Sequence, residues 1–269
     1  MSTERFENIL PPEYAAQLKV LSIGVGAIGS ANNVNLAKLG VSDFVMLDPD
    51  KVEAANVGVQ AFDYTHLDVA KVDAMAELLV INSPHAQVRV NPIVDLGVDE
   101  DGNPNPEPLE KYGRKVSIAA IAKKFEQPEQ LHEHNPNVVV SGVDDPEVRL
   151  QILDTLLNWD HAGVHDAKPR LYIDGRMGAH TAEIWGVLWG NHKCATIKDI
   201  EQNYRISLSG EFNAAPCGEV ALPPTASTCG ALMATMIRAY AMGEPLCRWA
   251  SIDLKHMTLI TDGMITDYL

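Results

Sequence analysis

The sequence predicts an α/β fold, a doubly wound and mostly parallel Rossmann-like sheet with an antiparallel extension at its C-terminal end. Three observations lead to this prediction. Apolar runs of strand length alternate with helical patterns through roughly the first 175 residues, which is typical of parallel strands joined by crossover helices. The first of these units carries a glycine-rich turn. Residues 183–189 alternate between apolar and polar, which favours an antiparallel strand, and residues 251–261 indicate one or two terminal strands.

The first unit, residues 19–50, reads strand, turn, helix, strand and acid. An apolar run at 20–23 precedes a Gly-x-Gly-x-x-Gly turn, and an amphipathic segment follows and stops at Gly40. A second apolar run at 44–47 ends in Asp48. This order predicts one right-handed β-α-β unit.

The glycine turn predicts a nucleotide site. Gly24 permits the tight turn, Gly26 lets a phosphate approach the backbone, and Gly29 lets the helix pack close to the strand. The helix N-terminus directs free N–H groups at an anion. Asp48 follows at the distance where a carboxylate can accept hydrogen bonds from ribose hydroxyls.

The rest of the chain is expected to form further helices and strands joined by loops. A loop at 51–65 and an acidic, proline-punctuated insertion at about 97–116 interrupt them. We expect a single domain over residues 1–269, with a nucleotide-binding part at about 15–175 and a C-terminal part at about 176–269. Helices are predicted at 67–81, 117–125, 146–159 and 228–242, and strands at 88–93, 138–140, 171–173, 183–189 and 251–261.

Composition and charge exclude several classes of protein. The net charge of −15, from 36 acids and 21 bases, disfavours a nucleic-acid binder because it repels phosphates. The N-terminus shows no secretory pattern, and no apolar run is long enough to span a bilayer. We therefore expect no membrane partner. The four cysteines form no Cys-x-x-Cys pair, so we expect reduced thiols in a cytoplasmic protein and no zinc site.

Two further residues are expected at the same crevice. In a doubly wound sheet, the residues just past the carboxyl ends of the strands converge, and Asp144 follows an apolar strand as Asp48 does. Lys71, in the first turn of the next helix, could reach phosphates as a point charge. Each has an ordinary alternative, a solvated lysine for Lys71 and a helix N-cap before Pro146 for Asp144. Together with the glycine turn they indicate a triphosphate with carboxylate-bound Mg²⁺.

Several segments carry a family resemblance. The stretches GVGAIGS, LDPDKVEAANVGVQ, DVAKVDA and VVVSGVDDPEVR resemble the ThiF/MoeB family, the adenylation cores of enzymes that activate ubiquitin-like proteins. The likeness covers residues 5–149 well and runs more loosely to Tyr240. The pattern is most similar to stand-alone members of bacterial or phage type, which have a segment like Asp174–Met177.

The resemblance implies roles for individual residues. The three turn glycines and Asp48 would hold the nucleotide and its ribose. Asn56 and Lys71 would contact phosphates, Gln60 would belong to the same nucleotide site, and Asp144 would bind Mg²⁺.

The family reaction is attack of a carboxylate on the α-phosphate of ATP, giving an acyl-adenylate and pyrophosphate. The resemblance therefore implies an adenylyltransferase acting on the C-terminus of a ubiquitin-like or sulfur-carrier protein. Family members are usually homodimers.

The chain departs from the family pattern in its cations. Val59 stands where the family has an arginine, and only Arg5 remains of the N-terminal family motif. Arg149 and Arg176 are candidates to replace the missing charge. The cysteine pairs that bind zinc in many relatives are also absent from the sequence, which agrees with the expectation of no zinc.

The family often passes the activated carboxylate to a cysteine as a thioester. Cys217, beside a glycine in a predicted loop, is the first candidate nucleophile, with a structural thiol as its alternative. Cys194, near a lysine and a histidine, is the second. Cys229 and Cys247 are interpreted as core thiols.

The sequence does not predict a histidine metal site. The four histidines with metal-like spacing lack a partner acid in a recognisable motif and are interpreted as surface residues. Two rival functions stay open, an NAD-dependent oxidoreductase on the same turn and a catalytically degenerate ATP-binding partner protein. The histidines concerned are His132, His134, His161 and His165.

Overall fold

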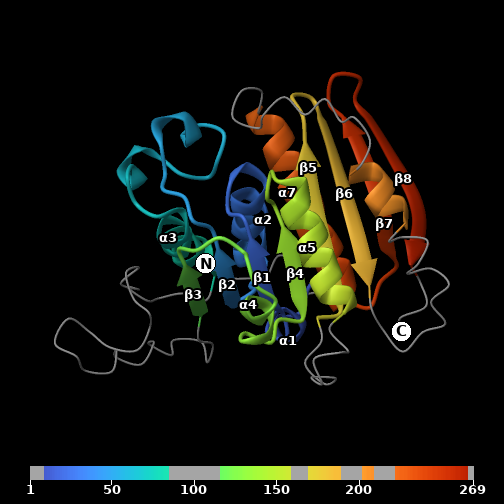
Figure 1. The fold of residues 1–269 in the computed structure, drawn as a ribbon, viewed down its shortest axis with the longest axis horizontal. Helices are drawn as coiled ribbons and strands as arrows, with labels where there is room; N and C mark the ends of the chain where they lie inside the picture. Colours follow the sequence, from blue (N-terminus) through green and yellow to red (C-terminus); the bar gives the residue numbers. More distant parts are fainter. Residues whose placement is uncertain (1–8, 85–115, 159–168, 189–201, 209–221, 266–269) are drawn as a thin grey trace.

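In the computed structural model, residues 9–84, 116–158, 169–188, 202–208 and 222–265 are described. Their strands form one eight-stranded sheet in the order β3-β2-β1-β4-β5-β6-β7-β8 (Figure 1). The strands are β1 Lys19–Ile23, β2 Asp43–Leu47, β3 Ser117–Ile121, β4 Val138–Ser141, β5 Leu171–Met177, β6 Thr181–Leu188, β7 Leu246–Asp253 and β8 Thr258–Ile265.

Helices and short 3₁₀ turns connect these strands. Residues 202–208 also contain a helical segment. The helices are α1 Pro12–Ala15, α2 Ala27–Lys38, α3 Lys71–Asn82, α4 Glu129–His132, α5 Pro146–Leu157 and α7 Pro223–Ala241, and the 3₁₀ turns are η1 Ala54–Asn56 and η2 Tyr64–His66.

The sheet changes character at β5, which is parallel to β4 on one side and antiparallel to β6 on the other. Strands β3, β2, β1, β4 and β5 are parallel, and β6, β7 and β8 extend them as antiparallel neighbours. This arrangement confirms the predicted fold class. The sheet runs unbroken from β3 to β8, while the proposed division into two parts stays a prediction.

Helices cover both faces of the sheet (Figure 1). On one face, α2, α3 and α7 bury apolar residues against the even-numbered positions of β1, such as Val20. On the other face, α4, α5 and residues 202–208 pack against its odd-numbered positions, such as Leu21 and Ile23. Because successive side chains of a strand point to opposite faces and both faces are covered, these short strands are mostly apolar on both sides.

The prediction of a helix at 117–125 is wrong, because Ser117–Ile121 forms the edge strand β3. It pairs in parallel with β2, from Asp43 opposite Ser117 to Leu47 opposite Ile121. The run contains two alanines, whose helix propensity is high, but pairing with a neighbouring strand overrides a weak local preference. The strand predicted at 88–93 lies outside the described residues, as does the insertion at 97–116 except for Val116.

The other predicted elements are confirmed with small shifts at their ends. Helix α7 begins at Pro223, five residues before the predicted start, and β5 continues to Met177 rather than ending at Ile173. The two terminal strands are β7 and β8, which form a hairpin. Within the described part of the chain, no helix is long and apolar enough to cross a membrane.

Candidate nucleotide site

The glycine turn joins β1 to α2 at the point where three parallel strands end together. Ile23 pairs with Leu47 of β2 and with Ser141 of β4, so the residues that follow these strands lie side by side. Gly24 adopts a left-handed backbone with φ of 82° and donates its N–H to the Leu47 carbonyl at 2.8 Å. This conformation strongly favours glycine.

Gly29 and Gly142 are required by close backbone contacts. A Cβ atom at Gly29 would lie 2.0 Å from the Gly24 carbonyl oxygen, and one at Gly24 would lie 2.9 Å from the Gly142 carbonyl carbon. A Cβ atom at Gly142 would lie 3.1 Å from the Gly29 nitrogen. The turn, the first turn of α2 and the segment after β4 therefore touch through backbone atoms alone.

Gly26 differs from the other two glycines of the turn. A Cβ atom there would meet only Nε2 of the Gln60 side chain, at 4.0 Å, so the space beside this glycine is open. Gly26 is the N-cap of α2 and has no side-chain capping bond within the described residues. The N-terminus of a 12-residue helix, which carries a partial positive charge, thus has open space beside its N-cap, and this suits an anion.

Asp48 follows β2 directly and is bound to the turn. Its Oδ2 accepts from the Val25 N–H at 2.8 Å, and its Oδ1 accepts from the Asp50 N–H at 2.9 Å. The side chain is only 5% exposed, and burial raises its pKa although the two N–H donors oppose the rise. The structure brings Asp48 to the glycine turn as expected, and its contact with ribose stays a prediction.

Lys71 is not a solvated lysine, so that alternative is wrong. It is the first residue of α3, it is 8% exposed, and its Nζ lies 2.8 Å from Asp50 Oδ2. The Lys71 backbone N–H also donates to the Asp50 carbonyl at 2.9 Å. Its charge opposes the rise that burial causes in the pKa of Asp48. Asp50 was missed from the sequence, although its position two residues after Asp48 could have indicated it.

The loop after β2 folds back over the turn and carries Gln60 with it. The Ala61 N–H donates to Ser30 Oγ of α2 at 3.1 Å, which anchors the loop. The Gln60 side chain faces Gly26, and its Oε1 is buried without a hydrogen-bond partner among the described residues. An orphaned buried polar atom beside an open glycine fits a ligand contact at this point.

Asn56 lies at the start of the same loop and has a local task. Its Oδ1 accepts from the Glu53 N–H at 2.9 Å, and its carbonyl accepts from the Gln60 N–H at 2.9 Å. Asn56 therefore shapes the turn that presents Gln60. Its contact with a nucleotide stays a prediction. Val59, which stands in place of the family arginine, is partly exposed in this turn.

Asp144 lies past the end of β4 and is exposed. It is not the N-cap of α5, so that alternative is wrong. Asp145 is the N-cap, and its Oδ1 accepts from the Glu147 N–H at 2.8 Å. Asp144 is thus an exposed carboxylate two residues from Gly142, which touches the glycine turn. A single carboxylate of this kind can bind Mg²⁺ together with nucleotide phosphates.

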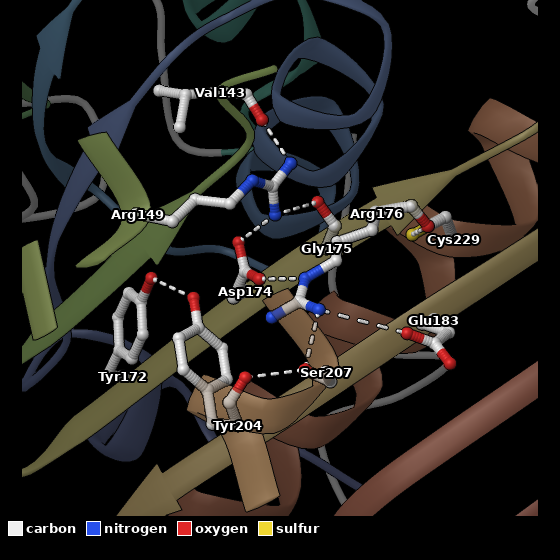
Figure 2. Close-up of polar contacts among 10 residues, drawn as sticks. All are labelled: Val143, Arg149, Tyr172, Asp174, Gly175, Arg176, Glu183, Tyr204, Ser207 and Cys229. Carbon is white, nitrogen blue, oxygen red and sulfur yellow. Dashed lines mark hydrogen bonds and ion pairs between the residues drawn. The ribbon is translucent and has the colours of Figure 1, made fainter. Parts of the chain in front are cut away.

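A buried ion-pair network lies beside this turn and was missed from the sequence (Figure 2). Asp174 of β5 is fully buried between Arg149 Nη1, which bonds its Oδ1, and Arg176 Nε, which lies 2.8 Å from its Oδ2. The two arginines hold the pKa of Asp174 below its usual range despite burial. Both candidates to replace the missing family arginine are therefore paired with Asp174.

The network continues to the antiparallel half of the sheet. Arg176 Nη1 donates to Ser207 Oγ at 2.8 Å, and its guanidinium carbon lies 4.6 Å from the centroid of the Tyr204 ring (Figure 2). Glu183 Oε2 lies 3.9 Å from Arg176 Nη1, and burial raises the pKa of Glu183. Arg176 thus connects β5 to residues 202–208 and to β6.

The cysteine and histidine predictions are only partly covered by the structure. Cys194, Cys217, His161 and His165 lie outside the described residues, as does the side chain of His132. Cys229 of α7 is fully buried, and burial raises the pKa of its thiol to about 12, which confirms a core thiol.

Two residues with weaker predictions are described. Cys247 is partly buried and donates to the Trp249 carbonyl. His134 is only partly exposed, and burial lowers its pKa. Among the residues that the structure describes, no three metal-ligating side chains of the His, Cys, Asp and Glu types gather at one point.

The fold and the turn define the class of this protein, a Rossmann-like α/β protein with a glycine turn at the end of its first strand. Within that class the chain belongs to the ThiF family, whose family model matches residues 13–258.

Curated relatives agree with this assignment. The chain is 28% identical over 171 residues to ubiquitin-like modifier-activating enzyme 5 of Drosophila ananassae and 26% identical to that of Aedes aegypti. These matches cover 62% of the chain but only 39% and 38% of the relatives. The chain therefore matches about two fifths of the length of these proteins.

Solved structures share the fold. Escherichia coli MccB in complex with ATP has a TM-score of 0.60 at 18% identity, covering 94% of this chain and 66% of MccB. A structure of PaaA has a TM-score of 0.64 at 12% identity, covering 98% of this chain and 75% of PaaA. At these identities the similarity shows the fold.

Proposed function

We propose that this protein is an ATP-dependent adenylyltransferase that activates a carboxylate. The observation that carries the proposal is the arrangement at the ends of β1, β2 and β4. An open glycine at a helix N-terminus lies beside Gln60, whose Oε1 is buried without a hydrogen-bond partner among the described residues, and a buried lysine and two strand-end carboxylates lie at the same edge of the sheet.

The proposed reaction joins a carboxylate oxygen to the α-phosphorus of ATP. The bond from that phosphorus to the bridging oxygen breaks, and pyrophosphate leaves with the bonding electrons. Such a transfer needs positioning and charge neutralisation more than covalent catalysis. The N–H groups of the turn and the α2 N-terminus would bind phosphate, and Asp48 would accept from ribose hydroxyls. Lys71 would contact the leaving phosphates, displacing part of its contact with Asp50.

Mg²⁺ would be held by Asp144 together with the phosphates. The side chain is an exposed oxygen ligand, which is the type that Mg²⁺ prefers. The metal would neutralise charge that builds on the departing pyrophosphate. Because Asp144 follows directly on the Gly142–Val143 backbone, its position depends on how that turn is held.

The substrate that we propose is the C-terminus of a ubiquitin-like or sulfur-carrier protein. Support comes from the names of the relatives, which activate a ubiquitin-like modifier, and from the fold shared with MccB, one structure of which contains MccA. A stand-alone mode of action, a homodimer that supplies a cation across its interface, and a cytoplasmic location remain parts of this proposal.

A cysteine would receive the activated acyl group in a second step. The thiolate sulfur of Cys217 would attack the acyl carbon, and AMP would leave as a thioester forms. Cys194 is the alternative nucleophile. Cys229 is unsuited to this role because it is buried and its thiol pKa is about 12.

Two other functions are separable from this one. An NAD-dependent oxidoreductase would use the same turn but gives Lys71 and Asp144 no special task. A degenerate ATP-binding partner protein, suggested by Val59, would bind ATP without turnover. Comparing the thermal stabilisation given by ATP–Mg²⁺ with that given by NAD separates the first of these from the proposal.

The decisive experiment is ATP–pyrophosphate exchange with radiolabelled pyrophosphate and a candidate carrier protein. Wild type should exchange label only with the carrier present, and Lys71→Ala should reduce the rate by about 10²-fold. Lys38→Ala is the matched control, because Lys38 is exposed at the opposite end of α2. A protein that binds ATP but exchanges no label with any carboxylate partner would refute the proposal.

A further inference from the structure

The side chain of Arg149 reaches back from α5 to the turn that precedes the helix. Its Nη2 donates to the Val143 carbonyl oxygen, and its Nη1 donates to Asp174 Oδ1 and, at 3.2 Å, to the Gly175 carbonyl (Figure 2). One guanidinium therefore joins the turn after β4 to the neighbouring strand β5. Because Arg149 is only 5% exposed, water competes little for these bonds.

Asp174 fixes the position of Arg149. It is fully buried, and both of its oxygens are used, one by Arg149 and one by Arg176. A buried carboxylate is stable only when it is paired in this way, and the pairing keeps its pKa low. The guanidinium is thus held from the side of β5 while it holds the turn after β4.

The Val143 carbonyl is a critical point of that turn. On one side of it, Gly142 touches Gly24 and Gly29 through backbone atoms, and its N–H donates to the Ile23 carbonyl at 2.9 Å. On the other side lies Asp144, exposed past the strand end. A bond at Val143 therefore restrains both the backbone under the glycine turn and the carboxylate next to it.

We propose that Arg149 and Asp174 form a positioning pair that fixes the Gly142–Asp144 turn for nucleotide binding. The inference rests on the proposed function for the ligand, but its structural part can be tested without one. Arg149 acts through the turn and not on the substrate, since its described contacts go to two backbone carbonyls and Asp174. It does not replace the missing family arginine.

Three variants separate this role from a general contribution to stability. Arg149→Lys keeps the charge but cannot bridge three acceptors as a planar guanidinium does. Arg149→Met removes the charge and leaves Asp174 paired with Arg176. The control is Arg205→Met, which breaks a partly exposed ion pair with Asp154 of the same helix.

Amide hydrogen exchange in the nucleotide-free protein gives the first readout. The Gly142 amide should exchange about tenfold faster in Arg149→Lys and faster still in Arg149→Met. Amides of β1 and β2 should keep their wild-type rates in both variants. Arg205→Met should leave the Gly142 amide unchanged.

Nucleotide affinity measured by calorimetry, with Mg²⁺ and with EDTA, gives the second readout. Arg149→Met should reduce the gain in ATP affinity that Mg²⁺ provides by about tenfold, and Asp144→Asn should reduce it similarly. The double variant should lose little more than either single one, because both act on the same carboxylate. A merely structural role would lower the melting temperature of Arg149→Met without changing this magnesium dependence.

The outcomes are distinguishable from failure of the proposed function. Unchanged exchange at Gly142 in a folded Arg149→Lys protein would overturn the positioning pair, and so would an unchanged magnesium gain. If Arg149→Met does not fold, Arg149→Lys decides both readouts. Wild type that binds ATP but exchanges no pyrophosphate would refute the adenylyltransferase and leave both comparisons valid. If wild type binds no nucleotide, the proposed function fails and the Gly142 amide alone decides the pair.

Discussion

Two glycines of the same turn should respond differently to replacement by alanine: Gly29→Ala should destabilise the fold, whereas Gly26→Ala should weaken nucleotide binding. In Gly29→Ala the new Cβ would lie 2.0 Å from the Gly24 carbonyl oxygen, whereas ordinary contact begins at 3.4 Å, so α2 must move about 1.4 Å from the turn. No flexible side chain can yield there. Overpacking of this kind costs about 1–3 kcal/mol, and replacing a helical glycine by alanine returns at most about 0.5–1 kcal/mol, the value for a helix interior. A net loss of about 1–2 kcal/mol should lower the melting temperature by roughly 4 °C.

In Gly26→Ala the new methyl group meets only the Gln60 side chain, at 4.0 Å, and φ of −70° lies outside the left-handed region that requires glycine. The folded protein should lose only about 0.5 kcal/mol, the cost of a poorer N-cap. The methyl group would, however, occupy the space through which a phosphate approaches the backbone. ATP–Mg²⁺ should therefore stabilise wild type in a thermal-shift assay but give Gly26→Ala almost no shift.

Each of the two glycine predictions can be refuted by a specific result. Full ATP stabilisation of Gly26→Ala would show that the phosphates do not sit over this glycine, and the site as described would be wrong. A Gly29→Ala protein as stable as wild type would show that α2 can shift without cost. Calorimetric unfolding of the free proteins, followed by ATP titration, provides both measurements.

Three further predictions concern buried titratable groups. The two arginines lower the pKa of Asp174, so its contribution to stability is present above the unfolded pKa of about 3.9 and is lost as pH falls through the folded pKa. Asp174→Asn should lose about 3–5 kcal/mol of unfolding free energy at pH 7. Its stability should also fall less steeply with acid than that of wild type, as measured by unfolding curves at several pH values. Burial raises the pKa of Glu183, so its contribution to stability is fully present below the unfolded pKa of about 4.3 and is lost as pH rises through the folded pKa. The melting temperature of Glu183→Gln relative to wild type should therefore rise between pH 4.5 and pH 8. A difference that stays constant over this range would contradict the burial argument. Cys229 should resist iodoacetamide at pH 8 in the native protein and react on unfolding, as read by mass spectrometry; rapid native labelling would contradict its burial.

The first β-α-β unit was predictable because its signals are local. Periodicity marks β1 and α2, and the glycines mark the turn that only they can form. The N-cap of α5 was also within reach of the sequence. Pro146 suits the first helical position, so the residue directly before it, Asp145, is the cap and Asp144 is left free.

Other features depend on contacts that a sequence does not display. Strand β3 exists because β2 offers it a partner across the 69 residues from 48 to 116, and its alanines alone favour a helix. The pairing of Arg149 with Asp174 likewise depends on how α5 crosses β5. An arginine in a helix pattern normally indicates a solvent-facing position, and nothing local marks this one as buried.

The backbone contact among Gly24, Gly29 and Gly142 has a consequence for how this protein can change over evolution or in the laboratory. Three chain segments meet there without any side chain between them, so no substitution at one position can be compensated at another. A saturation library should tolerate large side chains poorly at all three positions, with the sharpest losses at Gly24 and Gly29, where an added Cβ would lie within 3.0 Å of backbone atoms. Adaptation toward other nucleotides would have to proceed through the rim, where Gln60 and the partly exposed Val59 can be exchanged without disturbing that contact.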